Sequence, residues 1–199
     1  MELADAISRR QSVRRFTAQP VPDTVITQLL EAAALAPSAH GRQPWRFVVI
    51  APGAGRHTVV AAMDAEWSVQ LAADGTTVEQ IDARRAASAT RIIEAPALIM
   101  PCLDTTLLDV YPDAARQQAE YTMAVQSIGC AIQNILLRAV DLGYDAGWMC
   151  APVFCGATVQ RACDLPDSIV PQALIPIGVM AAPPKRRPKR SGADLRIDR

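Results

Sequence analysis

The sequence feature that most constrains the fold is a long helical stretch from residue 112 to residue 142. Apolar side chains recur there three and four residues apart, which places them on one face of an α-helix. The members of this face are Val125, Ile128, Ile132, Ile135, Leu136 and Ala139. Other elements must cover a face of this length, so we expect this helix to be the buried core of the fold and Gly143 to end it.

Shorter elements are predicted on both sides of this helix. Helices are expected at residues 3–10, 23–36, 58–71 and 76–93, a helical turn at 158–163, and strands at residues 45–50, 97–103, 147–153 and 172–180. The grouping of helices between few strands favours an α+β fold. Because 199 residues are enough for one full hydrophobic core, residues 1–199 are expected to form a single domain.

Composition narrows the functional classes. Lys and Arg number 20, as do Asp and Glu, and half of the residues are apolar, which is typical of a soluble globular protein. No apolar run reaches the roughly 18 residues of a membrane-spanning helix, and the acidic N-terminus does not resemble a secretory signal. The five cysteines contain no C-x-x-C pair and only two histidines accompany them. We therefore predict no metal site and expect a cytoplasmic location.

A basic tail ends the chain. Residues 183–199 hold seven Lys or Arg and two Asp, a net charge of +5, so residues 1–182 of this neutral protein carry −5. Such a tail attracts anions, although a solvated basic terminus is the alternative. Nucleic acid is disfavoured as a partner, because the tail has no aromatic residue to stack on bases and the rest of the chain would repel phosphates.

The candidate binding residues are cationic and polar rather than hydrolytic. Neither histidine lies in the sequence context of a serine or cysteine nucleophile, which disfavours hydrolysis. Positive charge comes instead from Arg10 and Arg14, on either side of Ser12, and from residues 185–190. Gly147 would let a flat ligand approach the backbone closely and accept its N–H. A phosphorylated planar cofactor would use both kinds of group.

Three segments among the first 50 residues resemble the opening motifs of the FMN-dependent nitroreductase family. They are residues 8–16 (SRRQSVRRF), 36–39 (APSA) and 43–49 (QPWRFVV). Residues 129–134, 141–143 and 147–149 are similar to the central helix and flavin-edge strand of that family, so the resemblance covers essentially the whole chain. It implies helices around a central, mostly antiparallel sheet, and a domain-sharing homodimer with two FMN molecules at the subunit interface.

The resemblance also implies binding roles near the N-terminus. Arg10 and Ser12 would serve the phosphate and ribityl chain of FMN, and Arg14 would lie near the pyrimidine ring and stabilise its reduced, anionic form. Gln11 belongs to the same motif and stands where the family commonly has a second arginine. This replacement weakens the local positive field and leaves Arg10 in register.

Further roles implied by the resemblance fall on a loop and on the C-terminal half. Pro37, Ser38 and Ala39 would reach the flavin of the partner subunit. Gly147 and Trp148 would face N5, the flavin atom that accepts and gives the hydride. No catalytic side chain is expected, because the flavin itself supplies the hydride chemistry.

The remaining residues of interest lie near these groups in the sequence. His40 could donate to a substrate, with an ordinary exposed loop histidine as the alternative. Gly41 stands where the family often has Asn, so the resemblance gives no side-chain contact to the flavin at that position. Arg187, with Arg190 as the alternative, would be the base of the basic tail that closes on the flavin phosphate.

A narrower resemblance runs through residues 71–75, 84–88, 111–114 and 149–155, which look like the FMN-binding C-terminal domain of the bifunctional deazaflavin-coenzyme glutamate ligase. It implies reduction of a dehydro precursor of the deazaflavin coenzyme. The expected reaction passes a hydride from NADPH, NADH or a reduced deazaflavin to FMN and then to a small oxidised acceptor, with ping-pong kinetics. Two alternatives stay open, a non-catalytic flavin-binding sensor and a flavin-fragmenting enzyme of the same fold.

Overall fold

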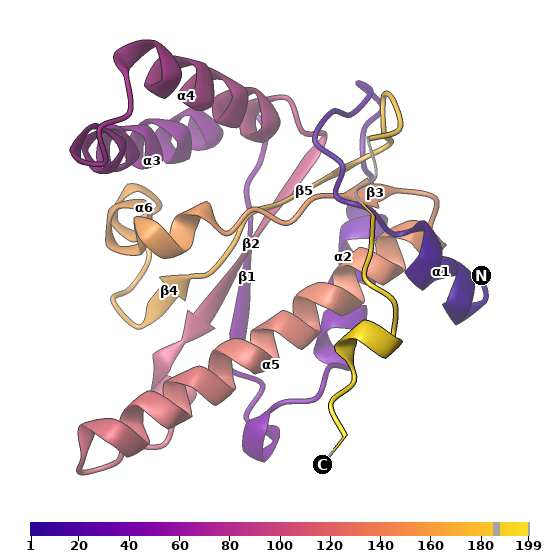
Figure 1. The fold of residues 1–199 in the computed structure, drawn as a ribbon, viewed down its shortest axis with the longest axis vertical. Helices are drawn as coiled ribbons and strands as arrows, with labels where there is room; N and C mark the ends of the chain where they lie inside the picture. The colour runs from indigo at the N-terminus through magenta and orange to yellow at the C-terminus, as the bar shows by residue number, and fades with distance from the viewer. Residues whose placement is uncertain (185–187, 199) are drawn as a thin grey trace.

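The computed structural model describes residues 1–184 and 188–198, which form an α+β fold with helices around an antiparallel sheet (Figure 1). The helices are α1 (Leu3–Arg9), α2 (Asp23–Ala34), α3 (Ala54–Ala73), α4 (Val78–Ile93), α5 (Ala114–Asp141) and α6 (Gly156–Ala162). The strands are β1 (Trp45–Val49), β2 (Ala97–Asp104), β3 (Asp145–Ala146), β4 (Ile169–Pro171) and β5 (Ile175–Gly178). Short 3-10 turns are η1 (Ala39–Gly41), η2 (Thr105–Leu107), η3 (Ala151–Phe154) and η4 (Ala193–Leu195). The predicted α+β class is confirmed.

The sheet is organised around β2. The strands run in the order β1-β2-β5-β3, β4 also pairs with β2, and each of these pairings is antiparallel. Successive side chains of a strand point to opposite faces. Ile99 and Leu103 therefore join a core on one face, whereas Leu98, Met100 and Cys102 join a second core on the other. Because both faces are covered, every residue of β2 is buried.

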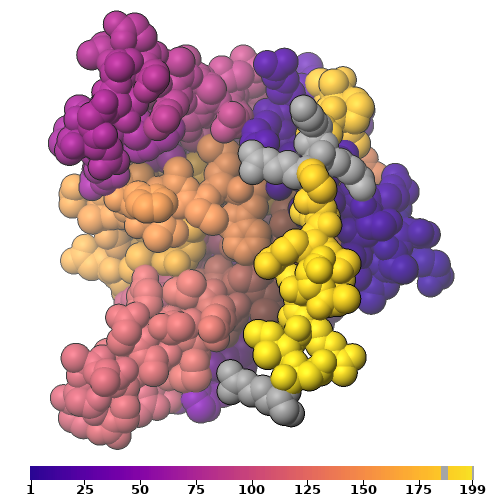
Figure 2. Space-filling model, in the orientation of Figure 1, coloured from indigo at the N-terminus to yellow at the C-terminus, as the bar shows by residue number. Residues whose placement is uncertain are grey.

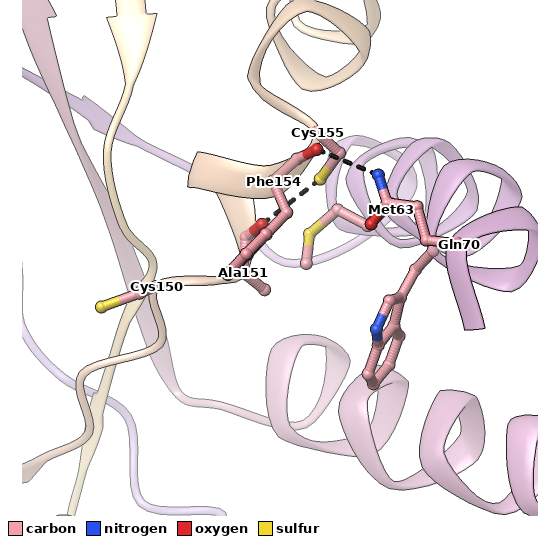
Figure 3. Close-up of a pocket in the computed structure, with 7 residues that line it drawn as sticks. Met63, Gln70, Cys150, Ala151, Phe154 and Cys155 are labelled. Carbon is pink, nitrogen blue, oxygen red and sulfur yellow. Dashed lines mark hydrogen bonds between the residues drawn. The ribbon is translucent and has the colours of Figure 1, made fainter. Parts of the chain in front are cut away.

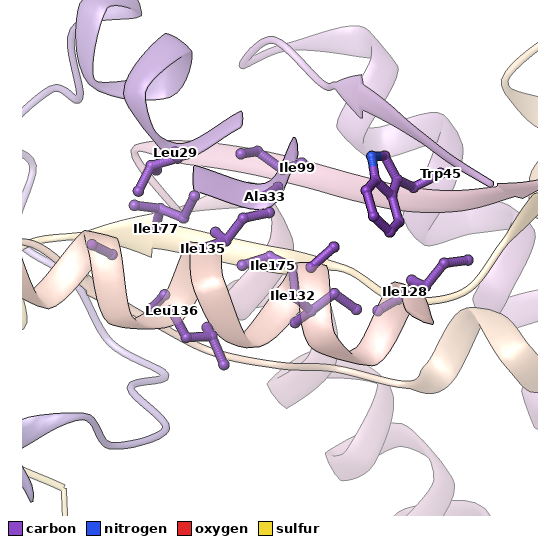
Figure 4. Packing of buried hydrophobic residues seen from close by; sticks show 14 of the residues in the cluster. Leu29, Ala33, Trp45, Ile99, Ile128, Ile132, Ile135, Leu136, Ile175 and Ile177 are labelled. Carbon is purple, nitrogen blue, oxygen red and sulfur yellow. The ribbon is translucent and has the colours of Figure 1, made fainter. Parts of the chain in front are cut away.

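The first core is built on α5, which packs against α2 and the sheet (Figure 4). The helix begins after Asp113, whose side chain accepts the N–H of Arg116 at 2.9 Å. It runs for 28 residues, and Gly143 follows its end with φ 80°, a left-handed conformation that glycine adopts readily. Its buried side chains contact Leu29 and Ala33 of α2 and residues of β1, β2 and β5. The predicted core helix and its glycine end are confirmed.

The composition of α5 also matches that of a membrane-spanning helix. An 18-residue window within it has a mean hydropathy of 1.3, and half of this window is buried inside the protein. Packing against α2 and the sheet accounts for these apolar side chains, as expected for the core helix of a folded domain. Because α5 has the length and hydropathy of a membrane-spanning helix, the expected absence of such a segment stays a prediction.

In the second core, Arg56 holds α3 against the end of α4. Its side chain is fully buried and donates to the carbonyl oxygens of Ile50, Ile92 and Ile93 at 3.3, 3.3 and 3.2 Å, and to that of Ala95. Burial lowers the pKa of this guanidinium from its ordinary value. Since the last carbonyls of a helix have no partner within it, this one cation satisfies several of them at the end of α4.

Two predicted strands differ in the structure. The strand predicted over residues 147–153 is wrong: β3 ends at Ala146, a single bridge joins Met149 to Leu174, and η3 follows. Pro152 in that turn has no N–H to give to a strand ladder. The strand predicted over residues 172–180 is shortened to β5, and β4 was not predicted, because three residues carry too little alternation to mark a strand.

Candidate functional site

Two segments that the sequence singled out meet at one cleft. Ser12 forms a parallel bridge with Ala146, and the N–H of Val13 donates to the Ala146 carbonyl at 3.1 Å. The cleft beside this contact is lined by Ser12, Val13, Arg14, Arg91, Gly147, Trp148, Met149 and Pro176. Backbone pairing therefore places the N-terminal arginine motif against the segment that follows β3.

Gly147 is required here by the protein's own backbone. A Cβ at this position would lie 2.6 Å from the carbonyl oxygen of Val13 and 3.2 Å from the ring of Pro176. The N–H of Gly147 donates to the carbonyl oxygen of Pro176 at 3.0 Å. The prediction that this N–H bonds a ligand is therefore wrong, because the donor is already used within the sheet. Other contacts of Gly147 with a ligand stay a prediction.

Trp148 offers the next donor along the chain. Among the described residues, no hydrogen bond from the backbone N–H of Trp148 to another group is found. This backbone N–H is therefore a free donor at the cleft. The residue is 40% exposed, and its indole extends toward Gly129 of α5, where a Cβ would lie 4.0 Å from the ring. Trp148 thus presents both a backbone donor and part of an aromatic ring at the cleft.

Arg14 and Arg91 give the cleft its positive charge. Arg91 comes from α4, and its burial together with the nearby charge of Arg14 lowers its pKa. Within residues 1–184 and 188–198, no carboxylate forms an ion pair with either guanidinium. Two neighbouring cations without acidic partners favour an anionic ligand. Arg91 was missed in the sequence, because only tertiary packing brings it beside Arg14.

Arg10 and Gln11 lie next to this cleft but are not among the residues that line it. Arg10 follows α1 directly, is half-buried, and forms no ion pair with another described residue. The amide nitrogen of Gln11 lies 3.6 Å from the sulfur of Met180. Their binding roles stay predictions.

The loop that contains Pro37, Ser38 and Ala39 lies apart from the cleft of the same chain. Ser38 Oγ accepts the N–H of Gln43 at 3.0 Å, and the N–H of Ala39 donates to Ser127 Oγ of α5 at 3.2 Å. These bonds fix the loop against α5. None of its residues lines the cleft, and the predicted contact of this loop with the flavin of a partner subunit stays a prediction.

The C-terminal tail starts beside the arginine motif. The N–H of Thr17 donates to Val179 O at 2.8 Å, and the N–H of Ala181 donates to Arg15 O at 3.1 Å. Arg187, predicted to contact a phosphate, lies outside the described residues, whereas Arg190 is described and exposed. Figure 2 shows residues 188–198 on the surface of the molecule. Both phosphate contacts stay predictions.

A second, apolar pocket of about 280 Å³ lies between α3 and η3 (Figure 3). Met63, Trp67, Gln70, Cys150, Ala151, Phe154 and Cys155 line it. Gln70 Nε2 donates to the Phe154 carbonyl at 3.3 Å and so joins the two walls. Burial raises the pKa of Cys155 to about 11, with a smaller contribution from Glu66. The thiol is therefore neutral near pH 7, as expected of a small apolar group.

A groove between α3 and α4 shares lining residues with both this pocket and the cleft. Trp67 lines both the pocket and this groove, and Arg91 lines both the groove and the cleft. The surface thus carries, side by side, a positively charged cleft, a groove and an apolar pocket with aromatic walls. This arrangement suits a planar, negatively charged ligand in the cleft and an apolar group, of the same or of a second molecule, in the pocket.

Comparison with known proteins decides the family. Residues 7–179 match the Nitroreductase family. The chain belongs to this family. The matched range contains every residue that lines the cleft and ends before the basic tail.

Relatives within the nitroreductase family span most of this chain. A "Putative NADH dehydrogenase/NAD(P)H nitroreductase" of Methanothermobacter thermautotrophicus is 27% identical over 189 residues, which are 94% of this chain and 82% of the relative. A structure from Desulfovibrio desulfuricans in complex with FMN is 26% identical, covers 100% of this chain and 97% of its own, and has a TM-score of 0.73. A nitroreductase-like protein from Bacillus cereus has a TM-score of 0.76 at 20% identity over 100% of this chain and 96% of its own, and shows the shared fold.

Proposed function

We propose that this nitroreductase-family protein is an FMN-dependent oxidoreductase that takes a hydride from NADH or NADPH and reduces a small oxidised acceptor. The observation that carries the proposal is the cleft in which Arg14 and Arg91 lie together without an acidic partner among the described residues. A reduced flavin ring is anionic and planar, so paired cations at its edge stabilise it. The FMN-bound neighbour supports the choice of cofactor.

The cleft has a volume of about 20 Å³, and the residues that line it fit one edge of the FMN ring. Arg14 and Arg91 supply positive charge, the Trp148 N–H supplies a hydrogen-bond donor, and Val13, Met149 and Pro176 supply apolar walls for a flat ring. When bound, FMN supplies the two-electron chemistry. Apart from the arginines, the described residues that line the cleft hold no charged side chain. The protein's own part is to bind, orient and electrostatically stabilise the cofactor.

The remaining cofactor contacts are proposed from the family resemblance. Arg10, Gln11 and Ser12 would hold the phosphate end, with Arg187 or Arg190 of the tail closing over it. Because the loop at Pro37–Ala39 lies apart from the cleft of its own chain, we propose that it serves the flavin of a second copy in a homodimer. Donor and acceptor would then use the same cleft in turn, which gives ping-pong kinetics.

The acceptor is proposed to occupy the apolar pocket and the groove that leads to it. Trp67 and Phe154 are aromatic walls suited to a planar, largely apolar molecule. A dehydro precursor of the deazaflavin coenzyme remains the specific acceptor that we propose, because the narrower resemblance points to it. Nitroaromatic compounds and quinones are suitable test acceptors of the same shape.

The decisive experiment is to measure bound flavin and its turnover. The purified protein should carry FMN, NADPH should bleach its absorption, and an acceptor should restore it. Removal of one charge-assisted contact costs roughly 1.5–3 kcal/mol, so R14A and R91A should each bind FMN about ten- to a hundredfold more weakly. R161A, which removes an exposed arginine of α6, is the control and should bind normally.

Three outcomes would contradict the proposal. Full flavin content in both R14A and R91A would remove the cleft as the cofactor site. Bound flavin that no nicotinamide donor reduces would favour the sensor. A change in the mass of the flavin after turnover would favour a flavin-fragmenting enzyme.

A further inference from the structure

Three potential metal ligands come together outside the cleft. They are His40 in η1, Asp109 after η2 and Glu120 in α5, and their ligand atoms all lie within 4.8 Å of one another. The three segments are separate in the sequence, and the loop and α5 are held together by the bond from the Ala39 N–H to Ser127 Oγ at 3.2 Å. The cluster is thus part of a fixed contact between the loop and the helix.

Glu120 provides the independent sign of a missing ligand. Its residue is 3% exposed, and Oε1 accepts the N–H of Asp109 at 3.3 Å. Oε2 is buried and has no hydrogen-bond partner among the described residues. An ionised carboxylate oxygen buried without a partner is costly, so this oxygen calls for a cation or a donor.

The neighbouring cation does not fill this role. Arg42 Nη2 pairs with Oδ1 of Asp109, so its charge offsets that carboxylate. No ion pair with Glu120 is found among the described residues. The cluster of two carboxylates and one guanidinium therefore keeps a net negative charge beside the imidazole, which favours a bound cation.

We propose that His40, Asp109 and Glu120 bind a divalent transition-metal ion of the Zn²⁺ type. One imidazole nitrogen with two carboxylate oxygens suits Zn²⁺, whereas Mg²⁺ and Ca²⁺ prefer oxygen ligands throughout. Zinc binds these donors at about 2.0–2.2 Å, so small side-chain rotations would bring the three ligands into range. Three protein ligands leave a fourth position for water or an anionic oxygen ligand.

This site differs from the sequence prediction of no metal. That prediction rested on the lack of a C-x-x-C pair and the scarcity of histidines, and it considered cages built mainly from Cys and His. The proposed site needs a single histidine, and its acidic ligands are indistinguishable in sequence from ordinary surface acids. The proposal does not depend on flavin binding or on turnover.

Calorimetric titration of the chelator-treated, dialysed protein with zinc chloride tests the proposal. We expect one Zn²⁺ per chain and much weaker binding of Mg²⁺. H40A and E120Q should each lower zinc affinity by at least about tenfold. H57A is the matched control, because His57 is an exposed histidine of α3 outside the cluster, and its affinity should equal that of the wild type. Zinc should also raise the melting temperature of the wild type and of H57A, and of H40A much less.

Several results would overturn the proposal. They are the absence of saturable zinc binding, equal zinc affinity in H40A and the wild type, and loss of binding in H57A. His40 is exposed, so H40A keeps the test valid even if E120Q disturbs packing. Unchanged zinc affinity in E120Q would likewise refute the metal site, because Oε2 would then take no part in binding the ion.

Discussion

At the scale of single residues, Arg56 shows how a buried cation can be structural. The R56M variant removes the donor that serves the carbonyls of Ile50, Ile92, Ile93 and Ala95. Hydrogen bonds that involve a charged group contribute roughly 1.5–3 kcal/mol, so we expect R56M to lower the free energy of unfolding by about 2–4 kcal/mol. Urea denaturation measures this change through the transition midpoint.

The control for this prediction is R84M, which replaces an exposed arginine on α4 and should change stability by less than about 0.5 kcal/mol. R56K should recover part of the loss at most, because one ammonium lacks the fork that reaches several acceptors. Equal stability of R56M and R84M would show that the carbonyls at the end of α4 do not need this donor.

At the scale of secondary structure, α5 determines the stability of the first core. Ile132 is 1% exposed and belongs to the core that α5 forms with α2 and the sheet (Figure 4). The I132A variant leaves a cavity in packed surroundings, which typically costs about 2–5 kcal/mol. We expect a loss of stability in that range by urea denaturation. The control is V69A, at an exposed position of α3, which should lower the free energy of unfolding by less than about 0.5 kcal/mol. An equally small loss of stability in I132A would contradict the central role of α5.

At the scale of the whole molecule, the separation of the loop from the cleft predicts shared sites in a dimer. R91E damages the cleft and A39E damages the loop, so each variant expressed by itself should lose most of its FMN. In a mixed dimer the intact cleft of one chain meets the intact loop of the other. Random pairing of two such chains therefore restores about one quarter of the sites.

Co-expression followed by flavin quantification and light scattering measures this recovery. Both variants must elute at the mass of the wild type for the comparison to hold. A monomeric wild type that retains FMN, or a co-expressed mixture with no more flavin than the single variants, would contradict the shared site.

The sequence by itself determined the elements whose signals are local. The apolar face of α5 repeats with the period of a helix, and Gly143 marks its end, so both could be read without knowledge of the fold. The arginine motif around Ser12 and the segment at Trp148 were likewise visible, because their residues stand at fixed spacings along the chain. The sequence therefore singled out Ser12, Arg14, Gly147 and Trp148, which the structure places along one cleft.

Tertiary structure decided which of these local features meet. Arg91 lies beside Arg14 because α4 packs near the arginine motif, and no spacing in the sequence encodes that distance. Gly147 is needed for the close approach of the Val13 carbonyl, a backbone contact between distant segments. The unpartnered oxygen of Glu120 likewise appears only after α5, the loop and Asp109 have packed together. Periodicity records how a residue relates to its own helix or strand, whereas charge pairing and burial depend on groups that folding brings from elsewhere in the chain.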